Sequence, residues 1–228
     1  MSNPEAAKWA AARRAVELVQ PGQIVGLGTG TTAIKFLELL AGKVREGLSI
    51  QGVPTSEAIG RQAREWGIPL LESFTRVDLT VDGADQIDPS GCIIKGGGGA
   101  LLREKLVALA SRVEVILVDP GKLVQELTRP LPVELIPFGV ETTLARLRQA
   151  GVEPTLRPGF TSDGGNLVAD CAYPPSLMRD PAQLHERLKA ITGVVETGLF
   201  LELVDQLVIG HEDGRVEERE FSRSVAGK

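Results

Sequence analysis

The 228-residue chain contains few of the residues on which several protein classes depend: two cysteines, two histidines and one tyrosine. Two cysteines are too few for the disulfide scaffold of a small secreted domain, and they are typical of a reducing compartment. A histidine-centred mechanism or a His-rich metal site is improbable with two histidines. We therefore expect a cytoplasmic protein whose chemistry depends on other side chains.

Long apolar runs and basic runs are also absent from the sequence. A membrane-spanning helix needs about 20 mainly apolar residues, and a secretory signal needs an apolar core; the chain offers neither, so we expect no membrane partner. The net charge is −5, and no basic cluster argues for nucleic acid as a partner. An anionic small molecule remains compatible, because lysines and helix termini can set the field within one pocket.

The hydrophobic content of 43 per cent is sufficient for a substantial core in one domain or two small ones. Up to about residue 120, short apolar runs alternate with amphipathic segments, which predicts an α/β fold with a doubly wound, mostly parallel sheet. The expected helices cover residues 4–19, 33–40 and 56–66, with another beginning near residue 100. The expected strands cover residues 23–27, 48–53, 68–71, 77–82, 92–95 and 113–118.

From residue 131 the pattern changes to strand, helix, two strands, helix and strand. The expected elements are 131–137, 140–150, 154–157, 166–171, 181–191 and 194–201. This order is the split βαβ arrangement of ferredoxin-like domains. Two further strands, 205–210 and 215–221, are expected to rejoin the first domain. We predict an α/β catalytic domain of residues 1–130 and 203–228, with a ferredoxin-like α+β domain of residues 131–202 inserted into it.

The stretch from residue 81 to 105, VDGADQIDPSGCIIKGGGGALLREK, concentrates reactive side chains. Asp82 ends an expected strand and Asp85 follows in the turn, while the glycines after Lys95 let backbone approach a ligand closely. Glu104 has apolar neighbours three and four positions away on its helix. Desolvation there suits a base that takes and returns a proton near neutrality. An ordinary surface ion pair remains the alternative for Glu104, and turn capping remains the alternative for the two aspartates.

A second candidate site follows the first strand, where Thr29, Gly30, Thr31 and Thr32 lead into a helix. Backbone N–H groups at a helix N-terminus favour a phosphate, and threonine hydroxyls add donors. A tight turn with a threonine N-cap is the alternative. The pattern is not a dinucleotide fingerprint, because Thr31 stands where the third glycine belongs and no acid ends the next strand near Gln51. We predict a cradle for the phosphate of a small molecule, with NAD a poor second choice.

Two lysines are weaker candidates for binding. Lys122 lies just past the end of an expected strand, where open α/β sheets bind ligands, although a lysine in any loop would look the same. Lys8 lies in the first turns of the N-terminal helix and by composition is a solvated lysine.

Six short blocks, taken together and in this order, resemble the signature blocks of the type A ribose-5-phosphate isomerases. They are GLGTGTTA at 26–33, VDGAD at 81–85, IKGGGGAL at 94–101, REK at 103–105, LPVELIP at 131–137 and GVVETGLF at 193–200. Each block alone is weak, but the collinear set extends from about Lys8 to about Gly210. The resemblance implies an enzyme of the pentose phosphate pathway that interconverts D-ribose 5-phosphate and D-ribulose 5-phosphate.

Aldose–ketose exchange needs a base that moves a proton between adjacent carbons, donors for an enediol(ate), and an acid/base group that opens the sugar ring. The resemblance implies Glu104 as the base, Lys95 with nearby N–H groups as the donors, and Asp82 for ring opening. It also implies that Asp85 binds substrate hydroxyls. The remaining substrate-binding residues are expected to be Thr29, Gly30, Thr31, Thr32, Gly83, Ala84, Gly96, Gly97, Gly98, Lys122 and, at the rim, Lys8.

No metal ion or cofactor is expected, because the acids are grouped with a lysine rather than with histidines at ligand spacing. The family is usually dimeric or tetrameric, so the resemblance implies a homodimer or homotetramer. Three alternatives remain open from sequence. They are a non-catalytic sugar-phosphate-sensing domain, an acyl-CoA transferase that uses Glu104 as nucleophile, and an isomerase with another preferred pentose phosphate.

Overall fold

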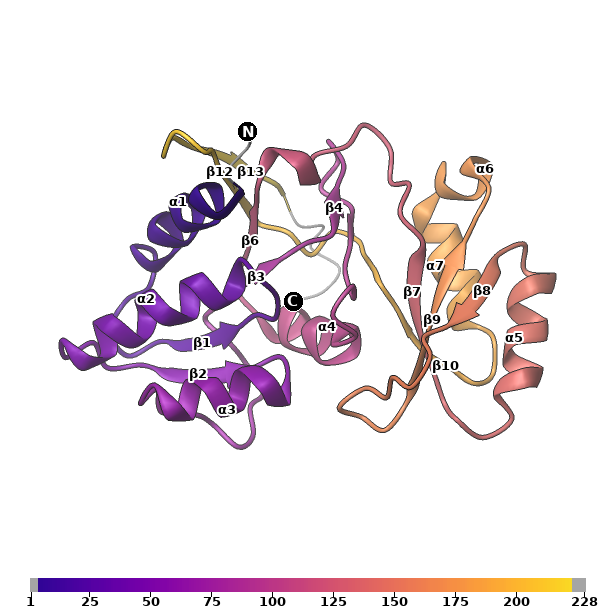
Figure 1. Cartoon of the computed structure of the whole chain (residues 1–228), viewed down its shortest axis with the longest axis horizontal. Coiled ribbons are helices and arrows are strands. Elements are labelled where there is room, and N and C mark those ends of the chain that lie inside the picture. Colours follow the sequence, from indigo (N-terminus) through magenta and orange to yellow (C-terminus); the bar gives the residue numbers. More distant parts are fainter. Residues whose placement is uncertain (1–3, 223–228) are drawn as a thin grey trace. The chain divides into compact units, whose positions relative to one another are not determined.

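The computed structural model describes residues 4–222 of the chain. By their internal contacts, the residues form two units that are interleaved along the sequence (Figure 1). The first unit comprises Met1–Ala84, Arg103–Leu123 and Glu202–Lys228, and the second comprises Asp85–Leu102 and Val124–Leu201. Residues 85–102 and 124–130 thus cluster with the second unit, whereas the sequence pattern assigned them to the catalytic domain.

A six-stranded sheet forms the first unit, with the order β13-β12-β6-β3-β1-β2. All neighbouring strands are parallel except β13, which pairs antiparallel with β12 at one edge. The strands are β1 (Ile24–Leu27), β2 (Gln51–Pro54), β3 (Leu79–Gly83), β6 (Glu114–Val118), β12 (Gln206–Gly210) and β13 (Val216–Glu220). The mostly parallel sheet is confirmed, and so is the return of the last two strands to the first unit.

Helices cover both faces of this sheet, as expected for a doubly wound fold (Figure 1). They are α1 (Pro4–Val16), α2 (Ala33–Arg45), α3 (Glu57–Glu65) and, from Arg103 on, α4 (Leu101–Ala110). The buried residues of α2 recur at helical spacing, and all five residues of β6 are buried because both of its faces are covered. Within residues 4–222, no helix is both long and apolar enough to cross a membrane.

The N-terminal helix is shorter than its sequence pattern predicts, and it packs through a face of small residues. It ends at Val16 instead of Val19, and its buried residues are alanines, while Trp9 is half-buried under the ammonium group of Lys35. Small side chains let α1 lie close to β6, β12 and α2. Helical spacing alone does not identify this face, because it does not reveal how close the neighbouring backbone comes.

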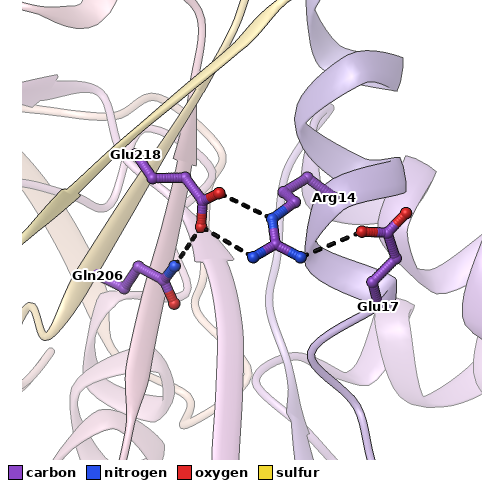
Figure 2. Close-up of polar contacts among 4 residues, drawn as sticks. All are labelled: Arg14, Glu17, Gln206 and Glu218. Atoms are coloured by element: carbon purple, nitrogen blue, oxygen red, sulfur yellow. Dashed lines mark hydrogen bonds and ion pairs between the residues drawn. The ribbon is translucent and has the colours of Figure 1, made fainter.

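Polar side chains connect α1 to the C-terminal hairpin (Figure 2). Arg14 donates from Nε and Nη2 to the two carboxylate oxygens of Glu218 at 2.8 and 3.2 Å, and Nη1 donates to Glu17 at 3.1 Å. Gln206 on β12 donates to the same Glu218 carboxylate at 2.5 Å. The first helix and the last two strands of the unit are therefore joined by one bidentate ion pair and its neighbours.

The second unit contains a four-stranded antiparallel sheet of order β10-β7-β9-β8. Its elements are β7 (Leu131–Leu135), α5 (Val140–Gln149), β8 (Glu153–Leu156), β9 (Leu167–Ala172), the short α6 (Pro175–Met178), α7 (Pro181–Lys189) and β10 (Val194–Thr197). This order confirms the ferredoxin-like α+β arrangement. A three-stranded sheet of β11 (Leu199–Phe200), β5 (Ile93–Ile94) and β4 (Gln86–Ile87) completes the unit.

Two predicted strands are wrong in detail, for identifiable reasons. Residues 68–71 form only an isolated bridge between Leu70 and Gly52, because Pro69 has no N–H with which to extend the ladder. The strand predicted for 194–201 divides at Gly198 into β10 and β11, which belong to different sheets. Gly198 donates to the Pro132 carbonyl at 2.7 Å and accepts from the Lys95 N–H at 2.9 Å, so the chain changes partners at this residue.

Two phenylalanines differ enough in burial to test which side chains hold the fold together. Phe36 on α2 is fully buried in the core of the first unit, whereas Phe138 is 91 per cent exposed. We expect Phe36→Ala to lower the free energy of unfolding by about 3–5 kcal/mol, because it leaves a cavity. Phe138→Ala should leave it within about 0.5 kcal/mol of the parent value. Urea unfolding measures both, and equal effects would contradict this assignment of the core.

Candidate active site

The strand order reverses between β1 and β3, because the chain moves outward from β1 to β2 and then returns past β1 to continue on the other side. In open α/β sheets, ligands bind in the crevice outside the carboxyl ends of the strands at such a switch point. The loop after β1 carries the predicted phosphate cradle, and the end of β3 carries Asp82, Gly83 and Ala84. The predicted phosphate cradle and the predicted acidic residues therefore lie at the same end of the first unit's sheet, beyond the carboxyl ends of β1 and β3 (Figure 1).

Asp82 is buried, with 1 per cent of its surface exposed, and the backbone holds its carboxylate. Oδ1 accepts hydrogen bonds from the N–H of Thr29 at 3.0 Å and of Gly83 at 2.7 Å. Gly28 lies so close that a Cβ built on it would be 2.4 Å from Oδ1 and 2.5 Å from the Asp82 Cα. The β1–α2 loop can cross the end of β3 only because residue 28 has no side chain.

Three hydroxyl groups form a cluster next to this loop. Thr29 Oγ1 lies 2.8 Å from Thr55 Oγ1 and donates to Ser56 Oγ at 2.9 Å. Ser56 in turn accepts from the N–H of Ile59 at 3.2 Å and caps α3. Thr55 and Ser56 were not among the site residues predicted from sequence. The signal that was available is their place at a strand–helix junction, as for Thr29 to Thr32.

The beginning of α2 suits an anion. Gly30 and Thr31 are exposed, while Thr32, the N-cap, is 9 per cent exposed and makes no capping hydrogen bond through its side chain. The first turn of α2 contains no acidic residue of its own, which leaves the positive end of the helix dipole without an acid on this helix. An ordinary threonine cap, the alternative left open by the sequence, therefore does not describe this turn.

Glu104 is buried, with 5 per cent of its surface exposed, in the first turn of α4. Val107 lies three residues later on the same face of α4 and covers the middle of β1 and β3. A Cβ built on Gly26 of β1 would lie 1.9 Å from Oγ1 of Thr80 in β3 and 2.8 Å from Val107 Cγ1. A crossover helix runs back along the strands, so one step of three residues toward its N-terminus moves about 4.5 Å toward their carboxyl ends. We infer that Glu104 faces the level of Gly28 and Asp82.

The two predicted lysines have different surroundings. Lys122 is half-buried in the short 3₁₀ helix Pro120–Lys122 that follows β6, at the same edge of the sheet as the carboxyl end of β3. Lys8 on α1 forms an ion pair with Glu5 at 2.7 Å, and Lys35 lies 3.2 Å from the other oxygen of Glu5. The substrate contacts expected of Lys122 and Lys8 stay predictions.

The second unit brings Asp85 and the glycine run together. Asp85 Oδ2 accepts from the N–H of Gly97 at 2.7 Å, and a Cβ on Gly97 would lie 2.7 Å from Oδ1. Lys95 is 3 per cent exposed, and its ammonium group lies 5.6 Å from the centre of the Phe200 ring. Gly97 and Gly98 are exposed, whereas Gly96 is buried. Asp85 and Gly97 line a pocket of about 320 Å³ within this unit, together with Arg129, Arg157 and Asp170.

Neither cysteines nor carboxylates form a metal centre in the part of the chain that the structure describes. Among residues 4–222, no three His, Cys, Asp or Glu side chains gather as ligands for an ion. Cys92 and Cys171 are not joined by a disulfide. Burial raises the pKa of the Cys171 thiol to about 12, so this sulfur remains protonated near neutral pH.

The chain is similar to known proteins along most of its length. The family described as ribose 5-phosphate isomerase A (phosphoriboisomerase A) matches residues 51–214. A ribose-5-phosphate isomerase A of Gloeobacter violaceus is 47 per cent identical over 216 residues, which cover 91 per cent of this chain and 93 per cent of that protein. The structure of ribose 5-phosphate isomerase A from Methanocaldococcus jannaschii superposes with a TM-score of 0.89 at 35 per cent identity, covering 95 and 99 per cent of the two chains.

A further solved structure is of a D-ribose-5-phosphate isomerase in complex with phospho-erythronic acid. It superposes with a TM-score of 0.90 at 34 per cent identity and covers 96 per cent of this chain and 99 per cent of that one. These likenesses confirm the resemblance that the six sequence blocks suggested.

The close approach at Gly28 can be tested without any ligand. Gly28→Ala places a methyl group against the Asp82 backbone, and we expect the free energy of unfolding to fall by about 1–3 kcal/mol from overpacking. Gly42→Ala, in the interior of α2 with only the end of Arg45 within 4.0 Å, is the matched control and should be neutral or stabilising. A Gly28→Ala protein as stable as the parent would contradict the geometry described above.

Proposed function

The chain belongs to the ribose 5-phosphate isomerase A family, and from this premise we propose that it interconverts D-ribose 5-phosphate and D-ribulose 5-phosphate. The enzyme is an isomerase of the non-oxidative pentose phosphate pathway, and the reaction proceeds through an enediol(ate). Phospho-erythronic acid, which one similar protein binds, carries a carboxylate and a phosphate. A phosphorylated enediolate likewise carries negative charge on the oxygen of its reacting end and on its phosphate.

The observation that supports this proposal is the burial of the Glu104 carboxylate in the first turn of α4. Glu104 takes the proton from C2 of the open-chain aldose, and the electrons of the C–H bond form the enediolate. After a proton moves from O2 to O1, the protonated Glu104 returns its proton to C1 and the ketose forms. Burial supports this role, because a carboxylate shielded from water is a stronger base toward carbon than a solvated one.

Charge develops on the substrate oxygens when the proton leaves carbon, and donors held in place beforehand stabilise that charge. Lys95 and the N–H groups of the glycines after it are the groups that we assign to this role. The buried backbone of Lys95, tied to Gly198, supports the assignment, because it restricts the movement of the residue.

Asp82 opens the sugar ring by exchanging a proton with the ring oxygen and the anomeric hydroxyl. The two N–H groups that donate to Oδ1 fix the orientation of its carboxylate. Asp85 binds substrate hydroxyls, with Gly83 and Ala84 beside it in the chain.

The phosphate binds to the loop of Thr29, Gly30, Thr31 and Thr32 at the N-terminus of α2, and Lys122 and Lys8 add positive charge. The exposed turn and the lack of an acidic residue in the first turn of α2 support this assignment. Binding energy from this remote group orients the reacting carbons, so the loop contributes to rate as well as affinity.

We also propose, from the family resemblance, that the protein acts in the cytoplasm as a homodimer or homotetramer. Light scattering behind size-exclusion chromatography tests the assembly, and a monomeric mass would contradict it.

The central experiment follows the conversion of ribose 5-phosphate to a ketose. The proposed function requires turnover of this sugar without added metal or coenzyme. A protein that binds ribose 5-phosphate and forms no ketose would support a sensing domain instead, and transfer of an acyl group from coenzyme A would support a transferase.

Glu104→Gln tests the base. We expect the variant to fold normally and kcat to fall by several orders of magnitude, because an amide of the same shape cannot accept the proton. The control is Glu38→Gln, an exposed glutamate on α2, which should retain the parent rate. Exchange of the C2 hydrogen with solvent measures the step directly, and near-normal exchange in Glu104→Gln would remove Glu104 from this role.

Thr31→Ala tests the phosphate loop. We expect kcat/KM for ribose 5-phosphate to fall about 10-fold or more, because binding energy from the phosphate is lost. Thr31→Ser, which retains the hydroxyl, should recover most of the loss. Steady-state kinetics of the two variants measure this, and an unchanged kcat and KM in Thr31→Ala would contradict the assignment.

A further inference from the structure

The glycine run after Lys95 poses a physical problem for the proposed mechanism. Backbone N–H groups stabilise an oxyanion well only when they are oriented before the charge develops. Consecutive glycines are the most flexible backbone available. Gly96 and Gly99 have φ values of +103° and +79°, so the run depends on conformations that other residues rarely adopt. Something outside the run must therefore fix its orientation.

The first peptide of the run is held from both ends. The N–H of Gly97 donates to Asp85 Oδ2 at 2.7 Å, and the carbonyl of Gly96 accepts from the N–H of Gly99 at 2.9 Å. This peptide plane therefore has both of its polar groups occupied. The next peptide, which consists of the Gly97 carbonyl and the Gly98 N–H, is the one whose N–H can serve the substrate.

Arg157, which follows β8, holds that second peptide by its carbonyl end. Its Nη1 donates to the Gly97 oxygen at 3.2 Å. A trans peptide is planar, and its C=O and N–H point in opposite directions. A donor that fixes the Gly97 carbonyl therefore also fixes the direction of the Gly98 N–H, which faces away from Arg157. Gly98 is exposed, as a donor to a ligand must be.

Arg157 is itself immobilised. Its Nε and Nη2 donate to the two oxygens of Asp170 on β9, at 2.8 and 2.7 Å, and its backbone N–H donates to the Val168 carbonyl at 2.9 Å. The side chain is 16 per cent exposed, so the pair is better shielded than an ordinary surface ion pair. A planar guanidinium with a bidentate partner has one remaining edge, and that edge faces Gly97.

Phe160 adds a steric constraint from the same loop. A Cβ built on Gly99 would lie 2.0 Å from the nearest carbon of the Phe160 ring. The Arg157 guanidinium lies 5.8 Å from the centre of the same ring. Arg157 and Phe160 thus enclose the glycine run from one side, and Asp85 holds it through Gly97. All of these residues belong to the second unit.

We propose that Arg157, held by Asp170, is a positioning residue for the isomerase reaction: it orients the Gly97–Gly98 peptide so that the Gly98 N–H donates to the enediolate oxygen. The inference rests on the proposed function. It predicts a loss of transition-state stabilisation with little loss of substrate binding, because Arg157 acts through the backbone and the phosphate loop is unchanged.

The test compares Arg157→Ala with Arg148→Ala. Arg148 on α5 forms an ion pair with Glu153 of β8 at 3.0 Å, so the control removes an arginine–carboxylate pair from the same unit without touching the glycine run. We expect Arg157→Ala to lower kcat about 10- to 100-fold, as expected for misplaced catalytic groups. KM for ribose 5-phosphate should stay within about threefold of the parent, and Arg148→Ala should retain the parent constants.

Inhibition by phospho-erythronic acid provides a second readout. Its carboxylate puts charge where the enediolate oxygen develops, so Arg157→Ala should weaken inhibition by about the same factor as kcat while KM is retained. Asp170→Asn should cause part of the same loss, and Arg157→Lys, which keeps the charge without the planar fork, should recover little. A purely structural role would instead lower thermal stability and leave the kcat of the folded fraction unchanged.

The outcomes distinguish a failure of the proposed function from a failure of the positioning role of Arg157. If the parent protein forms no ketose, the proposed function fails. If the parent is active and Arg157→Ala equals Arg148→Ala in kcat and in inhibition, the positioning role is wrong. Full recovery in Arg157→Lys would also overturn it. If Arg157→Ala does not fold, Asp170→Asn decides, because a folded Asp170→Asn protein with the parent kcat and inhibition contradicts the role.

Discussion

A single carboxylate held by backbone N–H groups organises the candidate site of the first unit. Asp82 ends β3 in a buried position, and its Oδ1 accepts from the loop after β1, which crosses it at Gly28. A buried carboxylate without hydrogen-bond partners would cost several kcal/mol, so this contact orders the loop as well as the acid. The hydrogen bond between Thr29 and Asp82 therefore fixes the loop after β1, which leads into α2, relative to the acid.

In the second unit, side chains from outside the glycine run hold it in place. Asp85, Arg157 and Phe160 restrain these residues, which have no side chains of their own. Glycine permits backbone to approach a ligand but carries a large conformational entropy. The ferredoxin-like sheet provides the rigid strands β8 and β9 from which an arginine and an aspartate reach the run. Under the positioning role that we propose for Arg157, the ferredoxin-like sheet contributes to catalysis as well as to structure.

Local pattern was enough to predict most of the fold. The apolar run of β6 is typical of a strand covered on both faces, and the spacing of the apolar residues in α2 is typical of a helix. Together with the strand–helix order after residue 131, these patterns were sufficient to predict the elements. The errors arose where a distant backbone decides the outcome. The buried face of α1 depends on how close β12 comes, and the change of partners at Gly198 depends on contacts with residues far away in the sequence.

The candidate residues were found partly by type and partly by resemblance. Glu104 drew attention because its helical neighbours are apolar, and it is indeed buried. Arg157 was overlooked, because it acts on a loop distant in sequence and a single chain does not show such pairs. The roles of all these residues remain proposals that the variants above address.

The ion pair between Arg14 and Glu218 joins α1 to β13, two elements of one unit that lie far apart in the sequence, and this has a consequence for biosynthesis. On the ribosome, both segments of the second unit, residues 85–102 and 124–201, emerge before β12 and β13 exist. The ferredoxin-like part is therefore complete while α1 can pack against α2 and β6 but still lacks β12. In a nascent chain, the alanine face of α1 is therefore only partly covered until β12 has been translated.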